Sequence, residues 1–142
     1  MKTEILKLLE IEGDYKEWIY TCKNGLEFKC IIKRTPHGKH LCGYVLLTKD
    51  NKYFEVEYDD IRIHVHGGLT FSDFYESVWM VGFDCGHYND YQPAYEYSSG
   101  VYRDMEYVIN ECQNLAEDFS KHSKELERNK KIDDIFKNQT ND

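Results

Sequence analysis

The sequence predicts an α+β domain with a single antiparallel or mixed β-sheet of about five or six strands and one long C-terminal α-helix packed on it. Three features support this fold class. Alternating residues flank Asn24-Gly25, a nearly continuous apolar run covers residues 41–47, and apolar residues recur at helical spacing from about Val101. A period of two residues followed by a period of three to four predicts a sheet covered by a helix.

The first third of the chain predicts a helix and a hairpin. Residues 2–12 carry apolar residues at helical spacing, which indicates a short opening helix. From Tyr15 to Arg34, aromatic and β-branched residues alternate with polar ones around Asn24-Gly25. Asn-Gly between such runs predicts a β-hairpin with a type I′ turn, because both central residues of that turn need a positive φ.

The middle of the chain predicts the remaining strands. Residues 41–47 indicate a strand that is buried on both faces and is therefore central in the sheet. Residues 53–58 alternate weakly, and residues 61–66 and 78–85 indicate two further strands. In these two strands alternation turns one set of side chains towards the core, namely Ile61, Ile63, Val65, Trp79, Val81, Phe83 and Cys85.

The C-terminal third predicts the covering helix. Apolar residues recur every three or four positions from about Val101 to about Arg128, with Ser98 and Ser99 as candidate caps. We therefore expect residues 1–128 to form one globular domain. Residues 129–142 are charged and rich in Asn, so we expect a flexible C-terminal tail there.

Charge is concentrated in the middle of the chain. Residues 53–98 contain one Lys or Arg and nine Asp or Glu, which gives −8, equal to the net charge of the whole chain. Seven of the twelve tyrosines lie there as well. Tyrosine combined with acid suits a basic partner or a cation, whereas it repels a phosphate backbone. We therefore expect no direct binding to a nucleic-acid backbone.

Cysteine usage and hydropathy predict the compartment. The five cysteines are an odd number and include no C-x-x-C pair, which favours reduced thiols. No apolar run approaches the length of a membrane span, and the first residues do not resemble a signal peptide. We therefore expect a cytoplasmic protein that has no membrane partner, and the sequence leaves open whether it forms a homo-oligomer.

Candidate functional residues gather on both sides of the strand predicted at residues 78–85. If that strand pairs with residues 61–66, then His64 and His66 lie near Asp84 on the face opposite the core, and Gly82 leaves room there for a ligand. The candidate ligand-binding residues are His66, Gly67, Gly68, Thr70, Asp84, His87 and Asp90.

Two interpretations of these residues stay open. Imidazoles and carboxylates suit zinc, manganese or iron, so His66, Asp84, His87 and Asp90 are candidate ligands of a divalent metal. Alternatively, the same side chains hydrogen-bond the backbone of the turns around them, as buried polar groups must. Weaker hypotheses are a nucleophilic pair of Cys85 with His87 and a phosphate site at Gly67-Gly68.

The tyrosine-rich segment of residues 88–99 also has two interpretations. A long loop that carries aromatic residues is commonly functional, so the segment is a candidate lid or contact surface. Tyrosine serves equally well in a rigid packing loop.

Four ordered blocks carry a resemblance to known proteins. They are CGYV at residues 42–45, VHGGLTF at 65–71, WMVGFDCGH at 79–87 with Asp90 and Pro93, and YRDMEYV at 102–108 with Leu115-Ala116-Glu117. The series resembles a family of small, functionally uncharacterised proteins carried by bacteriophages and prophages, over roughly residues 42–119. His64 is not part of the pattern. The resemblance implies an accessory protein of a phage or mobile element.

Three functions are compatible with these observations. The favoured one is a phage accessory protein that binds a host protein or a small nucleotide-type ligand, as an inhibitor of host defence. The second is a metal-dependent hydrolase of a nucleotide or phosphoester that uses His66, Asp84, His87 and Asp90. The third is an acidic mimic of a nucleic acid, which draws on the charge of residues 53–98.

Overall fold

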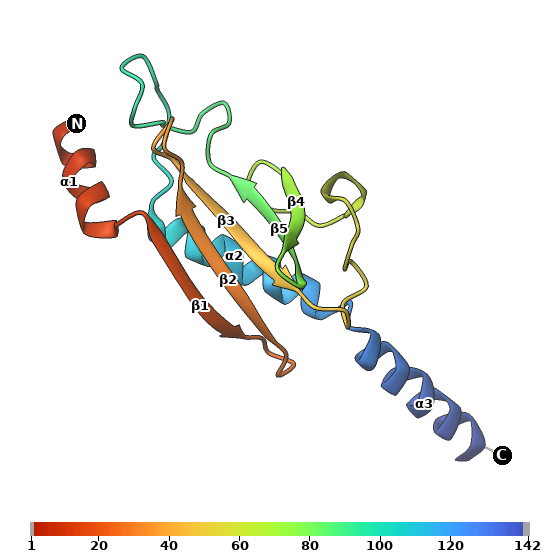
Figure 1. Cartoon of the computed structure of the whole chain (residues 1–142). Coiled ribbons are helices and arrows are strands. Elements are labelled where there is room, and N and C mark those ends of the chain that lie inside the picture. The colour runs from red at the N-terminus through yellow and green to blue at the C-terminus, as the bar shows by residue number, and fades with distance from the viewer. Residues whose placement is uncertain (1, 141–142) are drawn as a thin grey trace.

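The structure is a computed structural model that describes residues 2–140 (Figure 1). Its elements in chain order are α1 (Lys2–Glu12), β1 (Tyr15–Thr21), β2 (Glu27–Arg34), β3 (Leu41–Leu47), the 3₁₀ turn η1 (Tyr58–Asp60), β4 (Phe71–Tyr75), β5 (Val78–Asp84), α2 (Met105–Ser120) and α3 (Lys124–Thr140). The five strands form one sheet in the order β1-β2-β3-β5-β4, and every neighbouring pair is antiparallel. The predicted α+β class with an antiparallel sheet is confirmed.

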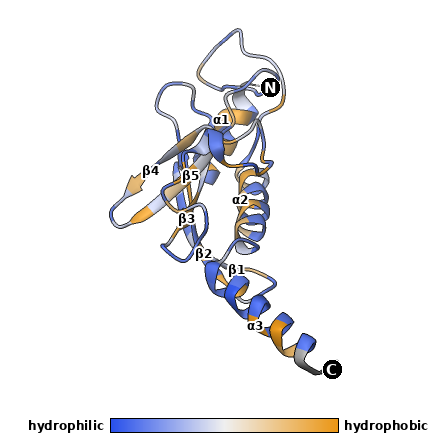
Figure 2. Cartoon of the chain, turned by 90° about the vertical axis from the view of Figure 1, so that its right-hand side faces the viewer, coloured by the Kyte–Doolittle hydropathy of each residue, from blue (hydrophilic) through white to orange (hydrophobic). Residues whose placement is uncertain are grey.

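Strand β3 lies at the centre of the sheet, as its apolar sequence predicts. Six of its seven residues are buried. Helix α2 packs across β3 and β2 on one face (Figure 2). At Gly43 the two layers are so close that an added Cβ atom would lie 2.7 Å from the sulfur of Cys112 and 2.6 Å from the ring of Phe83. A side chain at Gly43 would therefore push α2 away from the sheet.

A smaller apolar cluster occupies the opposite face of the sheet. Ile31, Leu46 and Met80 are buried there, with the ring of Tyr44 packed against them. That ring fills the space beside Gly82, where an added Cβ atom would lie 2.3 Å from it. The room that the sequence analysis assigned to a ligand beside Gly82 is therefore taken by Tyr44.

The predicted hairpin at Asn24-Gly25 is present, but its turn differs from the prediction. Only Gly25 has a positive φ, of 89°, and its N–H donates to the carbonyl of Cys22. The side-chain amide of Asn24 instead donates to the carbonyl of Ser120, at the end of α2. Asn24 thus joins the hairpin to the helix rather than adopting the left-handed conformation that a type I′ turn requires.

Two predicted strands are wrong. Residues 53–58 form turns that lead into η1, and residues 61–66 form an irregular segment. Strand β4 occupies the edge beside β5, so residues 61–66 have no strand to pair with. Their apolar residues are nevertheless turned towards the core as predicted, since Ile61 is buried and both Ile63 and Val65 pack against the core.

The predicted C-terminal helix is divided into two. Helix α2 begins at Met105, and its cap is Asp104, whose carboxylate accepts from the N–H of Tyr107; Ser98 and Ser99 are not the caps. The helix ends because residues 51–52 take carbonyl groups near its end. The side-chain amide of Asn51 donates to the carbonyl of Phe119, and the N–H of Lys52 donates to that of His122.

The second part, α3, includes most of the segment predicted as a tail. It projects away from the rest of the molecule (Figures 1 and 2), and every side chain from Glu127 to Asn138 is exposed. The flexibility of residues 129–142 stays a prediction. A transmembrane helix needs about 20 mostly apolar residues, and none of the helices within residues 2–140 meets that requirement.

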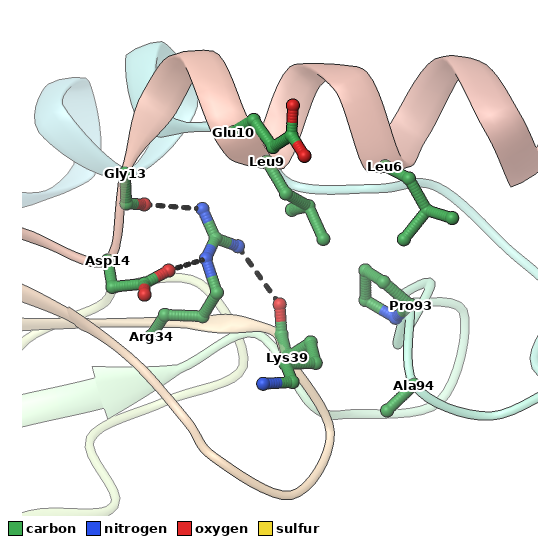
Figure 3. A pocket seen from close by; sticks show the side chains of 9 residues that line it. All are labelled: Leu6, Leu9, Glu10, Gly13, Asp14, Arg34, Lys39, Pro93 and Ala94. Atoms are coloured by element: carbon green, nitrogen blue, oxygen red, sulfur yellow. Dashed lines mark hydrogen bonds and ion pairs between the residues drawn. The ribbon is translucent and has the colours of Figure 1, made fainter.

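One buried arginine joins α1, the sheet and α2. Arg34, the last residue of β2, uses all five of its N–H donors inside the protein, and its side chain is 3% exposed (Figure 3). Its acceptors are the carboxylates of Glu12 and Asp14, the carbonyls of Gly13 and Lys39, and the hydroxyl of Tyr102.

The carboxylate of Glu12 completes this arrangement. It accepts from the hydroxyl of Tyr102 at 2.6 Å and from the N–H of Met105, the first residue of α2, also at 2.6 Å. The end of α1 therefore satisfies a backbone donor at the start of α2, which would otherwise lack a partner. Because the Glu12 side chain is 7% exposed, its charge depends on Arg34 for compensation.

We predict that Arg34→Met lowers the free energy of unfolding by about 3–5 kcal/mol, because it leaves a buried carboxylate without its partner. Urea denaturation of the two proteins measures the difference. Lys29→Met is the matched control, since Lys29 lies in the same strand and its ion pair with Glu17 is exposed, at 41% and 48%; it should change stability by less than about 1 kcal/mol. Equal losses from both variants would contradict the prediction.

Candidate functional site

The loop before β4 and the loop after β5 bring most of the predicted site residues together. An added Cβ atom at Gly67 would meet the ring of His87, and the hydroxyl of Thr70 donates to Asp84 at 3.0 Å. The rings of His66 and His87 are 6.2 Å apart between centroids. Gly68 differs from the others, because an added Cβ atom there would point into open space.

His66 and Asp90 form the buried half of this group. One ring nitrogen of His66, Nδ1, lies 2.7 Å from the hydroxyl of Tyr107, and the other, Nε2, lies 2.8 Å from a carboxylate oxygen of Asp90. Asp90 also accepts from Arg103 Nε at 3.0 Å and from the N–H of His87 at 3.1 Å. The side chains of His66 and Asp90 are 13% and 1% exposed.

These contacts give His66 and Asp90 a structural role. They join the loop before β4, the loop after β5 and the first turn of α2. Both ring nitrogens of His66 and both oxygens of Asp90 already have partners, so neither side chain has a free group to offer a ligand. For this pair the structural interpretation is the one that the geometry supports.

The pKa of Asp90 reflects the same contacts. Burial by itself would raise the pKa of this carboxyl group, because it disfavours the charged form. The hydrogen bonds from His66, Arg103 and the N–H of His87 outweigh burial and lower the pKa below its ordinary value. Folding therefore stabilises the ionised form of Asp90.

Asp84 and His87 form the accessible half, with side chains 30% and 34% exposed. Asp84 accepts from the N–H of Gly86 at 2.9 Å as well as from Thr70. Nε2 of His87 lies 3.3 Å from Asp84 Oδ1, but it makes no hydrogen bond of good geometry with any residue from 2 to 140. His87 is therefore the imidazole whose polar atom is still available.

His40 is a third imidazole at this place, and the sequence analysis missed it. It lies in the connection between β2 and β3, and an added Cβ atom at Gly86 would come 2.8 Å from its Nε2. Burial lowers the pKa of His40, although the nearby Asp84 and Asp90 act in the opposite direction. Only the register of β3 with β5, in which Cys42 pairs with Asp84, brings His40 to this site.

Two other residues of the sequence hypotheses lie elsewhere. Cys85 is 2% exposed and its side chain belongs to the core, so it forms no nucleophilic pair with His87. Burial also raises the pKa of this thiol far above its ordinary value. His64 lines a different cavity, beside Lys121 and His122.

The metal hypothesis gains no geometric support. Within residues 2–140, no group of three or more His, Cys, Asp or Glu side chains is arranged so that it could hold a metal ion. The buried half of the predicted set is engaged in hydrogen bonds, which leaves Asp84 and His87 as its accessible members. A metal bound by all four residues would have to displace Arg103 and Tyr107 from their partners.

The tyrosine-rich segment forms a closed loop beside His87. Its neck is held by two backbone hydrogen bonds, from Tyr91 to the carbonyl of Val101 and from Val101 to the carbonyl of Asn89. At the neck an added Cβ atom on Gly100, whose φ is 106°, would lie 2.1 Å from the carbonyl oxygen of Asn89, so this close approach requires glycine. The segment has the form of an Ω-loop.

Inside this loop further contacts hold the chain. The N–H of Gln92 donates to the hydroxyl of Ser98 at 2.8 Å, and the rings of Tyr95 and Tyr97 stack 5.8 Å apart. A cavity of about 350 Å³ lies between the loop and the accessible half of the site, and its lining includes His87, Tyr88 and Tyr97. Tyr88 and Tyr97 are 94% and 87% exposed, whereas Tyr91 is 7% exposed.

Comparison with known proteins gives no family assignment, because no protein-family model, curated protein or solved structure matches this chain. The function therefore has to be argued from the geometry of the site.

We predict that His66→Gln lowers the free energy of unfolding by about 1–3 kcal/mol, because it breaks buried hydrogen bonds. His87→Gln makes the same chemical change at a side chain without such bonds and should cost about 0.5 kcal/mol or less. Thermal and urea denaturation compare the two. If His87→Gln is the more damaging variant, the assignment of the buried and accessible halves is wrong.

We also predict that Asp90 contributes to acid sensitivity. Its folded pKa lies below its unfolded value, so its ionised form stabilises the protein above about pH 4, and this contribution is lost as the pH falls through the folded pKa. Asp90→Asn should therefore be less stable than the parent at pH 7, and the difference should shrink on acidification. Urea denaturation between pH 7 and about pH 2.5 tests this. A difference that stays constant would mean that the charge of Asp90 is not involved.

Proposed function

We propose that this chain is an accessory protein of a bacteriophage or prophage that acts by binding a host protein, as an inhibitor of host defence. The phage context comes from the resemblance of residues 42–119 to phage-encoded proteins. The binding function comes from the Ω-loop of residues 89–101 together with Tyr88, which we call the tyrosine loop. The observation that carries the proposal is the exposure of Tyr88 and Tyr97, at 94% and 87%.

Exposed tyrosines of this kind suit a protein partner. Tyrosine is enriched among the residues that dominate protein–protein binding, because a large rigid ring buries apolar area while its hydroxyl keeps a hydrogen bond. The loop also contains Ser, Asn and Gln, which add adaptable hydrogen bonding. Tyr91 faces inwards and anchors the same loop, so the two exposed rings are presented on a fixed support.

The order of the loop also supports binding. A loop that must be ordered on association loses binding free energy to conformational entropy. Here the hydrogen bonds at the neck and between Gln92 and Ser98 already fix the backbone. The tyrosine loop is thus preorganised for binding.

Charge indicates the kind of partner surface. Residues 88–101 contain Asp90 and Glu96 but no Lys or Arg. The neighbouring accessible half of the site adds the carboxylate of Asp84. A partner that presents basic residues around an apolar centre would complement this surface.

The geometry gives less support to a nucleotide-type ligand. The cavity beside the tyrosine loop is lined by neither Lys nor Arg, the residues that usually neutralise a phosphate. The N–H of Gly68, which a phosphate cradle would use, donates to the carbonyl of Val65. A host protein is therefore the partner that we propose.

The test uses the purified protein as bait in a lysate of a bacterium that the phage infects. We predict that Tyr88→Ala/Tyr97→Ala reduces the retention of a specific host protein at least about tenfold, since each lost ring costs about 1 kcal/mol or more. Quantitative mass spectrometry measures retention. The variant should keep the melting temperature of the parent, because both rings are exposed.

Two controls complete the test. Tyr58→Ala removes a tyrosine that is 36% exposed on η1, outside the loop, and should retain the same host protein. Tyr91→Ala removes the buried anchor of the loop and should lower the melting temperature. If parent and double variant retain the same proteins equally, the tyrosine loop is not the binding surface.

A further inference from the structure

The largest cavity of the molecule is an apolar groove beside α1, away from the tyrosine side chains. It has a volume of about 530 Å³. Leu6 and Leu9 of α1 form one wall and point towards Pro93 and Ala94, which form the other (Figure 3). Arg34 lies at one end, but its five donors are all engaged, so it offers nothing to an anion. The groove therefore suits an apolar occupant.

Helix α3 carries a surface of matching character. Ile132, Ile135 and Phe136 are 50%, 57% and 60% exposed, and their spacing of three and four residues places them on one face. The rest of the helix is strongly polar. An isolated helix of this length is marginally stable in water, and packing of its apolar face is the usual source of further stability.

The charges beside the two surfaces are complementary. On one side of the apolar stripe of α3, helical spacing aligns the basic residues Lys124, Arg128 and Lys131, and on the other side it aligns Glu125 with Asp133. The groove has an acidic wall at Glu10 of α1 and a basic wall at Lys39. A helix lying in the groove in one direction would place its basic side along Glu10 and its acidic side along Lys39.

A molecule cannot place its own α3 in its own groove. In Figure 1, α1 and the loop that forms the groove lie at one end of the molecule, and α3 extends from the other. Residues 121–123 between α2 and α3 form a short connection that is itself held by Asp50 and Lys52. The occupant must come from another molecule.

We propose that α3 of one molecule docks in the groove between α1 and residues 93–94 of a second copy. The mode is that of an amphipathic helix in an apolar groove. The two surfaces differ, so the contact is heterologous, and association continues head to tail unless a ring closes. The proposal is independent of the function argued for the tyrosine loop.

The test uses two double variants of the full chain at exposed positions. Leu6→Glu/Ala94→Glu places charges in the groove, and Ile132→Glu/Ile135→Glu places charges on α3. We predict that the mass of the parent in sedimentation equilibrium rises with concentration, over a range of about 1 μM to 1 mM. Each double variant alone should stay monomeric. Ile11→Glu is the matched control, because Ile11 is 82% exposed on α1 outside the groove lining, and it should associate as the parent does.

An equimolar mixture of the two double variants decides between modes of association. The groove variant still has an intact α3, and the α3 variant still has an intact groove. The mixture should therefore form a complex of one molecule of each and nothing larger. If the parent stays monomeric, if the groove variant associates alone through paired α3 helices, or if the mixture does not combine, the proposal is overturned. Circular dichroism melts of both variants, expected to match the parent, show that folding is retained.

Discussion

The buried hydrogen bonds of Arg34 are the interaction on which the other parts of the structure depend. The guanidinium is at the end of β2 and reaches α1, the turn after β2 and Tyr102 just before α2. Glu12 extends the network to the first N–H of α2. The tyrosine loop is fixed between this network on one side and the pair of His66 and Asp90 on the other. The exposed tyrosines are therefore presented by a framework of charge-assisted hydrogen bonds, which are stronger than neutral ones.

Local patterns predicted the elements whose environment is simple. Strand β3 is buried on both faces and α2 covers one face, so their sequences carry periods that can be read without knowing the partners. Residues 61–66 alternate like a strand, but their fate depends on β4 occupying the edge beside β5. The break after α2 likewise depends on Asn51, which is 68 residues away from the carbonyl that it binds. Long-range competition for hydrogen bonds is not visible in a local period.

The candidate site shows the same division. Its membership was predictable, because loops at the two ends of neighbouring strands converge in any antiparallel pairing. Its chemistry was not. Whether a histidine is engaged on both nitrogens, like His66, or keeps one nitrogen available, like His87, depends on distant groups such as Tyr107 and on distances of a few tenths of an ångström. His40 enters through strand register alone, and no local motif marks it.

The link between Glu12 and α2 also constrains how the chain is made. Met105 follows its acceptor by 93 residues. At a synthesis rate of roughly 5–20 residues per second, the carboxylate of Glu12 emerges from the ribosome several seconds before the helix start that it will satisfy. During that interval the first hairpin has no α2 to cover it, and its apolar face is open to solvent. Native packing of the N-terminal third is therefore a late event that follows translation of α2, and any chaperone that protects the nascent chain would act on this hairpin.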